Sequence, residues 1–117
     1  MPDHCINVGI CEQATISLAA GMAMEGLRPV VYTILPFLIE RAFEQIKLDV
    51  NQQCLPVGLV GHSNSEGGPT HQELSAPCLM GLCRNIRSHY PEWKDQLPGI
   101  VQAIDFDAPW FLALREP

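Results

Sequence analysis

The stretch "EQATISLAAGMAMEGLRPVVYTI", residues 12–34, decides the fold. Its first part is apolar on nearly every face of a helix, and Gly26 is placed to end that helix. Residues 30–34 then form a compact β-branched run, with Pro29 just before it. We therefore predict a helix over residues 12–24 that is buried on most sides, followed by an interior strand.

The same alternation continues along the chain. Pro36 can open a helix in which apolar residues recur at helical spacing as far as Val50, so this helix is predicted to lie on a sheet face. A second strand pattern, residues 55–61, leads directly into a polar, glycine-rich loop, residues 62–72. Loops that follow buried strands are where α/β proteins bind ligands.

Beyond the loop, the sequence predicts further alternating elements. These are a helix at about residues 74–82, a strand at 85–90, a helix over 91–104 that is interrupted at Pro98, and a strand at 109–114. Parallel strands need crossover connections, so this order predicts a mostly parallel sheet covered on both faces. We expect one domain over residues 1–117, an α/β fold built as a three-layer α/β/α sandwich.

Composition and charge exclude several classes of function. Thirteen acidic and seven basic side chains give a net charge of −6, and the basic residues are scattered, which disfavours binding to nucleic acid or anionic membranes. No apolar stretch approaches the roughly 18 residues of a membrane span, and we expect no targeting segment. The five cysteines show no zinc spacing, so we expect buried, reduced thiols in a cytoplasmic protein.

Glu12 is the first candidate for chemistry. A carboxylate in the first turn of a helix has a simple explanation, because it interacts favourably with the helix dipole by about 0.3–1 kcal/mol. Its apolar surroundings, with Val8, Ile10 and Cys11 before it, indicate instead that the carboxylate is buried. A buried carboxylate needs a partner, and that is a property of functional acids. The residues alone leave both interpretations open.

Two histidines and one aromatic residue could join it. His62 opens the glycine-rich loop and His71 lies near its end, so both imidazoles could converge on one pocket, or each could be a solvated bystander. A metal-dependent hydrolase with Glu66 and Glu73 as further ligands is a weaker alternative, because no helical spacing sets the ligands. Phe37 is either a core anchor or a platform for a flat ligand, and the sequence alone favours the core.

Four segments together resemble a known family. They are "INVGICEQATISLAAGMAMEGLRPVVYTILPF" (6–37), "RAFEQIKLDV" (41–50), "LPVGLVG" (55–61) and "GGPTHQ" (67–72). Their order and spacing resemble the pyrimidine-binding (Pyr) domain of transketolase-like, thiamine-diphosphate-dependent enzymes. The resemblance implies the fold of that domain, with its opening strand and helix missing here.

The resemblance also implies roles for single residues. Glu12 would hydrogen-bond a ring nitrogen of the aminopyrimidine of thiamine diphosphate and favour the tautomer that takes a proton from the thiazolium carbon. Phe37 would stack on the aminopyrimidine. His71 would face the substrate's oxygens and help proton transfer, and His62 would lie near the substrate channel. Glu12 and His71 are thus the implied catalytic residues, Glu12 and Phe37 bind cofactor, His62 and His71 bind substrate, and no residue binds metal.

Departures from the family shape the functional hypothesis. In the family, the diphosphate and its magnesium belong to another domain with a Gly-Asp-Gly motif, which this chain lacks. The resemblance therefore implies the pyrimidine-binding half of a split transketolase-like enzyme that transfers ketol or aldehyde groups, is a homo-oligomer, and needs a separate diphosphate-binding subunit. Whether the isolated chain holds the cofactor stays open. The alternative is a non-catalytic module that self-associates or binds a small molecule.

Overall fold

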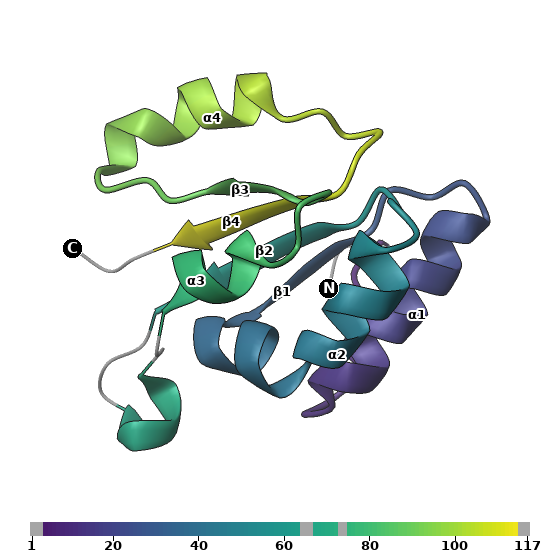
Figure 1. The fold of residues 1–117 in the computed structure, drawn as a ribbon, viewed down its shortest axis with the longest axis horizontal. Coiled ribbons are helices and arrows are strands. Elements are labelled where there is room, and N and C mark those ends of the chain that lie inside the picture. The colour runs from purple at the N-terminus through teal and green to yellow at the C-terminus, as the bar shows by residue number, and fades with distance from the viewer. Residues whose placement is uncertain (1–3, 64–66, 73–74, 115–117) are drawn as a thin grey trace.

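The strands of the protein form one parallel sheet (Figure 1). The computed structural model describes residues 4–63, 67–72 and 75–114. Within them, the strand order is β1-β2-β4-β3, and every neighbouring pair is parallel. The predicted parallel α/β fold is confirmed. The strands are β1 (Val30–Ile34), β2 (Gly58–His62), β3 (Arg87–His89) and β4 (Trp110–Leu114).

Helices cover both faces of this sheet, as the three-layer prediction requires. Figure 1 shows α4 (Leu97–Ala103) on one side of the strands and the other main helices on the opposite side. Those other helices are α1 (Glu12–Met24), the π-helical turn η1 (Phe37–Arg41), α2 (Phe43–Gln45), the π-helical turn η2 (Ile46–Asn51) and α3 (Ala76–Gly81). Two 3-10 turns, η4 (Pro69–His71) and η5 (Lys94–Gln96), lie in connections.

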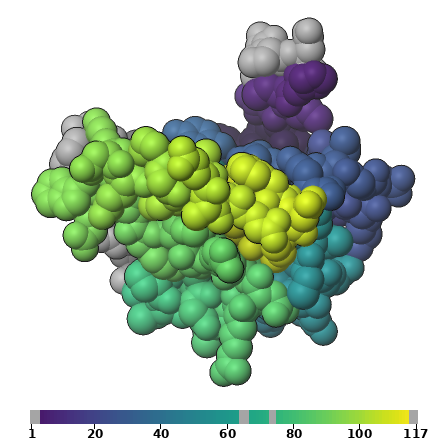
Figure 2. Space-filling view, turned by 90° about the horizontal axis from the view of Figure 1, so that it is seen from above, coloured from purple at the N-terminus to yellow at the C-terminus, as the bar shows by residue number. Residues whose placement is uncertain are grey.

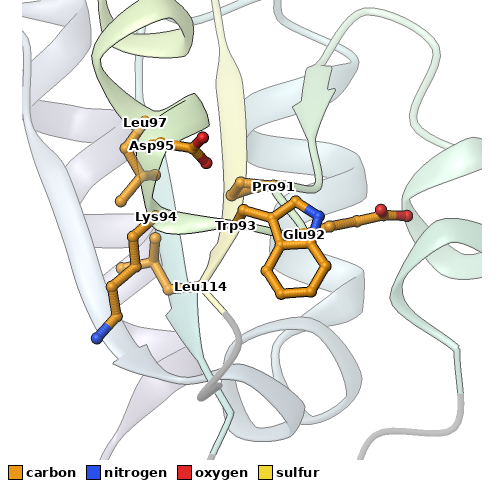
Figure 3. A pocket seen from close by; sticks show the side chains of 7 residues that line it. All are labelled: Pro91, Glu92, Trp93, Lys94, Asp95, Leu97 and Leu114. Carbon is orange, nitrogen blue, oxygen red and sulfur yellow. The ribbon is translucent and has the colours of Figure 1, made fainter.

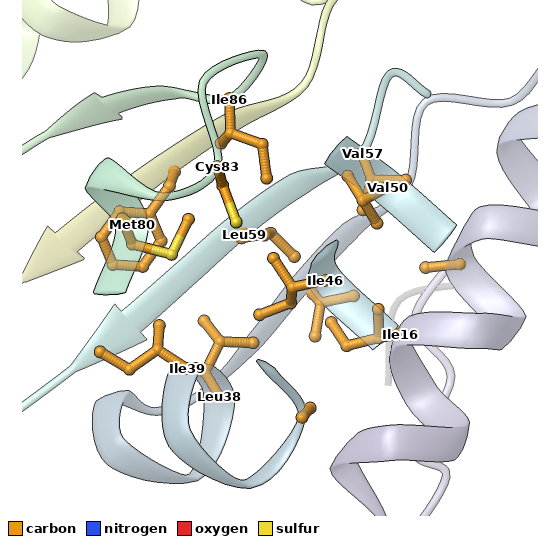
Figure 4. Packing of buried hydrophobic residues seen from close by; sticks show 14 of the residues in the cluster. Ile16, Leu38, Ile39, Ile46, Val50, Val57, Leu59, Met80, Cys83 and Ile86 are labelled. Atoms are coloured by element: carbon orange, nitrogen blue, oxygen red, sulfur yellow. The ribbon is translucent and has the colours of Figure 1, made fainter. Parts of the chain in front are cut away.

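The core is divided in two by the sheet. Successive residues of a strand point to opposite faces, so β4 contributes Phe111 to the main core and Trp110 to a smaller cluster beneath α4. This is why the run 110–114 is apolar throughout. Figure 4 shows the main core, in which helix residues meet Leu59 of β2. The fully buried helix residues there include Ile16, Leu38, Ile39, Ile46 and Val50.

The bounds of α1 agree with the prediction, but its burial does not. Only one face of α1 packs against the protein, and Leu18 and Met24 are exposed large apolar side chains on the rest of it. The prediction of a helix buried on most sides is therefore wrong. An apolar residue on every face is compatible with burial but does not say how many neighbouring elements are present.

The predicted position of β1 inside the sheet is also wrong. Among the described residues, β1 pairs only with β2, and the Gly58 N–H donates to the Pro29 carbonyl at 2.9 Å where that pairing begins. Val30 and Tyr32 point to the face that carries α4, and their exposed fractions are 54% and 63%. A β-branched run shows that residues suit a pleated surface, and edge and central strands share that property.

Two prolines lie in the first turns of helices, and the prediction that Pro98 interrupts a helix is wrong. Pro98 lies in the first turn of α4, so the predicted helix over 91–104 is corrected to the η5 turn followed by α4. Pro77 lies in the first turn of α3, where the Cys78 N–H donates to the Ser75 hydroxyl at 3.4 Å. The first helical turn tolerates proline because its N–H groups have no intrahelical partner.

The cysteines are less buried than predicted. Only Cys83 is buried, Cys11 is partly exposed, and Cys5, Cys54 and Cys78 are exposed. Burial raises the pKa of the Cys83 thiol, and the nearby Lys47 charge opposes that rise.

The N-terminal segment projects from the rest of the described surface. The described N-terminal residues, purple in Figure 2, stand out from the body of the molecule, and residues 4–10 are all exposed. Within the described residues, no helix has the length and apolarity needed to cross a membrane.

Candidate functional site

Glu12 begins α1, and its side chain is not used to cap that helix. The Thr15 N–H and hydroxyl both donate to the Cys11 carbonyl, at 3.0 and 2.9 Å, and so fix the first turn. The Glu12 side chain is only 9% exposed. A buried carboxylate is costly unless a cation or several donors satisfy it. The protein must therefore supply a partner for Glu12.

That partner is Arg41, the last residue of η1. Its Nη1 donates to Glu12 Oε2 at 3.0 Å, and its side chain remains 39% exposed. The same guanidinium lies over the ring of Phe37, with its central carbon 4.0 Å from the ring centroid. A guanidinium over an aromatic face is attracted to the ring's negative face. Arg41 thus links the buried carboxylate to the aromatic ring.

His71 meets the same aromatic ring from the glycine-rich loop. The Phe37 and His71 ring centroids are 4.8 Å apart and the ring planes cross at 66°, which is an edge contact. The Thr70 hydroxyl and His71 Nδ1 share a hydrogen bond of 3.1 Å. Glu12, Arg41, Phe37 and His71 form a continuous row of contacts, which we call the Glu12–His71 cluster.

Two glycines explain how the loop delivers His71. A side chain at position 67 would overlap the His71 ring, so only glycine leaves room for the imidazole. Gly68 adopts φ +82°, in the left-handed region that favours glycine. The observed position of the His71 imidazole therefore requires both glycines of "GGPTHQ".

His62 does not join this cluster. It ends β2 and stacks on Tyr32, with ring centroids 5.1 Å apart and an interplanar angle of 18°. Its Nδ1 is buried and has no hydrogen-bond partner in the described part of the chain. Its predicted role near a substrate channel stays a prediction. The convergence of two imidazoles is not seen, since each ring contacts a different aromatic residue.

The metal-dependent alternative finds no support within the residues that the structure describes. No three His, Cys, Asp or Glu side chains there lie close enough to hold a metal ion. Glu66 and Glu73, the additional ligands considered for that alternative, lie outside the described residues. The chemistry of the cluster is thus that of a carboxylate, a guanidinium, an aromatic ring and an imidazole.

One hollow of the surface lies beside the cluster, and another lies away from it. A groove of about 460 Å³ runs between residues 4–9, α1 and β1, and Glu12 lines it. A second hollow, of about 450 Å³, lies between the segment that leads into α4 and the end of β4 (Figure 3). The exposed Trp93 indole lines this second hollow, but no residue of the cluster does. We therefore place the candidate site at Glu12.

Arg41 is the main residue that the sequence alone did not single out. Two signals pointed toward it. A buried carboxylate implies a cationic partner, and Arg41 follows Phe37 by four residues, the spacing that places side chains on one helical face. Neither signal identifies Glu12 as its partner, because the two residues are 29 positions apart in the sequence.

Comparison with known proteins gives a consistent result. The sequence model of the family described as "Transketolase, pyrimidine binding domain" matches residues 1–117. The 1-deoxy-D-xylulose-5-phosphate synthase of Synechococcus elongatus is 39% identical, and that of a Cyanothece species is 48% identical. Each match covers 100% of this chain but 19% of the relative. The chain thus spans about a fifth of the length of these relatives.

A solved structure is similar as well. A chain described as "Split gene transketolase, inactive beta4 tetramer" superposes with a TM-score of 0.83 and 29% sequence identity. The match covers 98% of this chain and 38% of that one. The fold seen here, with its parallel sheet between helices, is therefore the fold of that protein's corresponding region.

Proposed function

This chain belongs to the family of transketolase pyrimidine-binding domains, and on that premise we propose that it provides the pyrimidine-binding half of a thiamine-diphosphate active site. The reaction proposed is transfer of a ketol or aldehyde group. The observation that carries the proposal is the Glu12–His71 cluster, in which a buried carboxylate, an aromatic ring and an imidazole lie in one row.

The side chains of the cluster suit one end of thiamine diphosphate. An aminopyrimidine needs a carboxyl group that can share a proton with a ring nitrogen and an apolar surface for its flat face, and Glu12 and Phe37 are residues of these types. The other end needs ligands for a diphosphate and a magnesium ion. In the part of the chain that is described, no group of acidic or histidine side chains could hold that ion. A separate diphosphate-binding subunit is therefore part of the proposal.

Each residue has a distinct task in this scheme. Thiamine diphosphate, when bound, supplies a carbon nucleophile for carbonyl substrates. Glu12 holds a hydrogen bond to the pyrimidine and shares a proton with it, in surroundings where burial strengthens both effects. Phe37 orients the ring. His71, at the outer end of the cluster, exchanges protons with substrate oxygens.

The requirement for a partner has support from the comparisons. The similar split-gene transketolase is described as an inactive tetramer, and the match covers 38% of one of its chains. We expect this chain to form homo-oligomers and to be inactive on its own. The same description favours a second candidate function, a self-associating module without catalytic activity.

Reconstitution separates these candidates. The chain is mixed with diphosphate-binding subunits encoded near its gene, thiamine diphosphate and magnesium, and ketol transfer is measured. In a working mixture, Glu12→Gln should lower kcat by about a hundredfold or more, because it removes an acid from proton transfer. Glu25→Gln, which neutralises an exposed carboxylate at the other end of α1, is the matched control.

Two results would contradict the proposal. If Glu12→Gln retained the activity of the wild-type mixture, Glu12 would not be the acid. If no partner subunit yielded activity and the purified chain formed a stable oligomer in analytical ultracentrifugation, the non-catalytic module would be the better description.

A further inference from the structure

We infer that the Arg41 side chain occupies the place of the aminopyrimidine in the isolated chain, and that a pyrimidine can bind only after Arg41 has moved away. This inference rests on the proposed function of Glu12 and Phe37. It adds to that function a residue that competes with the ligand for the same two contacts.

The geometry of Arg41 supports this competition. Its guanidinium is flat and carries N–H donors, as one edge of an aminopyrimidine does. It lies 4.0 Å from the Phe37 ring centroid and donates to Glu12 at 3.0 Å. These contacts, one with an aromatic face and one with a carboxylate, are the two that the pyrimidine would make. A spacing of 4.0 Å is van der Waals contact, so no ring fits between the guanidinium and Phe37.

The remaining approach to Phe37 is also restricted. His71 makes an edge contact with the Phe37 ring at a centroid distance of 4.8 Å. The observed loop requires glycine at positions 67 and 68, because a side chain at position 67 would overlap the His71 ring and Gly68 adopts φ +82°. The Arg41 side chain, in contrast, is 39% exposed, and its only ion pair in the described residues is with Glu12. Arg41 is therefore the member of the cluster that can move.

The exchange keeps the buried carboxylate satisfied. If Arg41 simply left, Glu12 would lose its cation at a site where an unpaired charge is costly. A pyrimidine whose ring nitrogen shares a proton with the same carboxyl group replaces the lost contact. Because a partly exposed cation–π contact and a partly exposed ion pair are individually weak, we expect Arg41 to reduce pyrimidine affinity by about tenfold, and not to abolish it.

The test measures binding and needs no partner subunit. The purified full chain is titrated with 4-amino-5-hydroxymethyl-2-methylpyrimidine, which carries the flat ring without a diphosphate, and the dissociation constant is measured by ligand-observed NMR. Arg41→Met keeps a chain of similar length but has no donor or charge, and it should bind about tenfold more tightly than wild type. Arg28→Met removes an exposed ion pair with Asp107 and should bind as wild type does.

A second readout follows Arg41 itself. In wild type, the ring current of Phe37 should shift the Arg41 side-chain protons upfield, and saturation with the pyrimidine should remove that shift. Adding Glu12→Gln or Phe37→Leu to the Arg41→Met variant should remove its gain in affinity. Circular dichroism at the binding temperature verifies that each variant is folded.

Three outcomes overturn the inference: Arg41→Met binds no better than wild type, neither protein binds the pyrimidine, or the Arg41 proton shifts persist at saturation. None of these outcomes decides the proposed function, which depends on the effect of Glu12→Gln in the reconstituted mixture. A mixture that is active and depends on Glu12, together with an Arg41→Met variant of unchanged affinity, would retain the function and reject the inference.

Discussion

At the start of α1, a buried carboxylate is held by a partly exposed guanidinium, and the two residues differ in what they can do. Glu12 cannot leave its position, because its side chain is enclosed at the head of a helix that packs on the core. Arg41 reaches it from the end of η1 and touches solvent. Glu12 is therefore suited to act as a fixed acid, and Arg41 is suited to give up its contact with Glu12 to a ligand.

The loop glycine beside His71 gives a prediction at the scale of one residue. Gly67→Ala should displace the imidazole from Phe37, because the added methyl group would overlap the His71 ring. NMR should show loss of the ring-current shift on the His71 protons, and the reconstituted enzyme should lose activity with little change in overall stability. Gly99→Ala is the control, since a methyl group there meets open space. Unchanged His71 shifts in Gly67→Ala would contradict this account of the loop.

At the scale of elements, local signals fixed where α1 and β1 lie. Gly26 and Pro29 separate them, and both elements have the predicted bounds. For β2, the apolar run 55–61 differs from the observed strand, Gly58–His62. An apolar run is a property of the residues, whereas a strand begins where its backbone starts to pair with a neighbouring strand. For β2, that pairing begins where the Gly58 N–H donates to the Pro29 carbonyl. The sequence therefore predicted the type of all three elements, but it did not predict the residue at which β2 begins.

Strand β3 carries a prediction about pH. Burial lowers the pKa of His89, the Arg87 charge lowers it further, and the His89 Nε2 has no partner in the described structure. The unfolded chain therefore binds a proton at a higher pH than the folded one does, so this group should destabilise the fold as pH falls below about 6.5.

The measurement is urea unfolding at pH 7.5 and pH 5.5. Wild type should lose more stability between the two pH values than His89→Gln, which has no titrating ring. His4→Gln, a change at an exposed histidine in the projecting N-terminal segment, should behave as wild type. An equal pH dependence in wild type and His89→Gln would show that His89 does not carry the effect.

At the scale of the whole molecule, stability is concentrated on one side of the sheet. The main core includes the fully buried Phe111, whereas the cluster under α4 is small. Phe111→Ala should lower the free energy of unfolding by about 3–5 kcal/mol, a large part of the total for a domain of this size. Phe106→Ala removes the same ring at an exposed position and should cost less than about 1.5 kcal/mol. Urea midpoints measure both, and similar losses would mean that the core does not dominate.

The sequence by itself determined the kinds of elements, their order and the parallel sheet, because helical periodicity, β-branched runs and glycine or proline boundaries act over a few neighbouring residues. It also singled out Glu12, Phe37 and His71 as candidates. Only the tertiary structure decided that β1 lies at the edge, that His62 lies apart, and that Arg41 links Glu12 to Phe37. Contacts between residues 29 positions apart depend on how elements pack, and no local pattern records that packing.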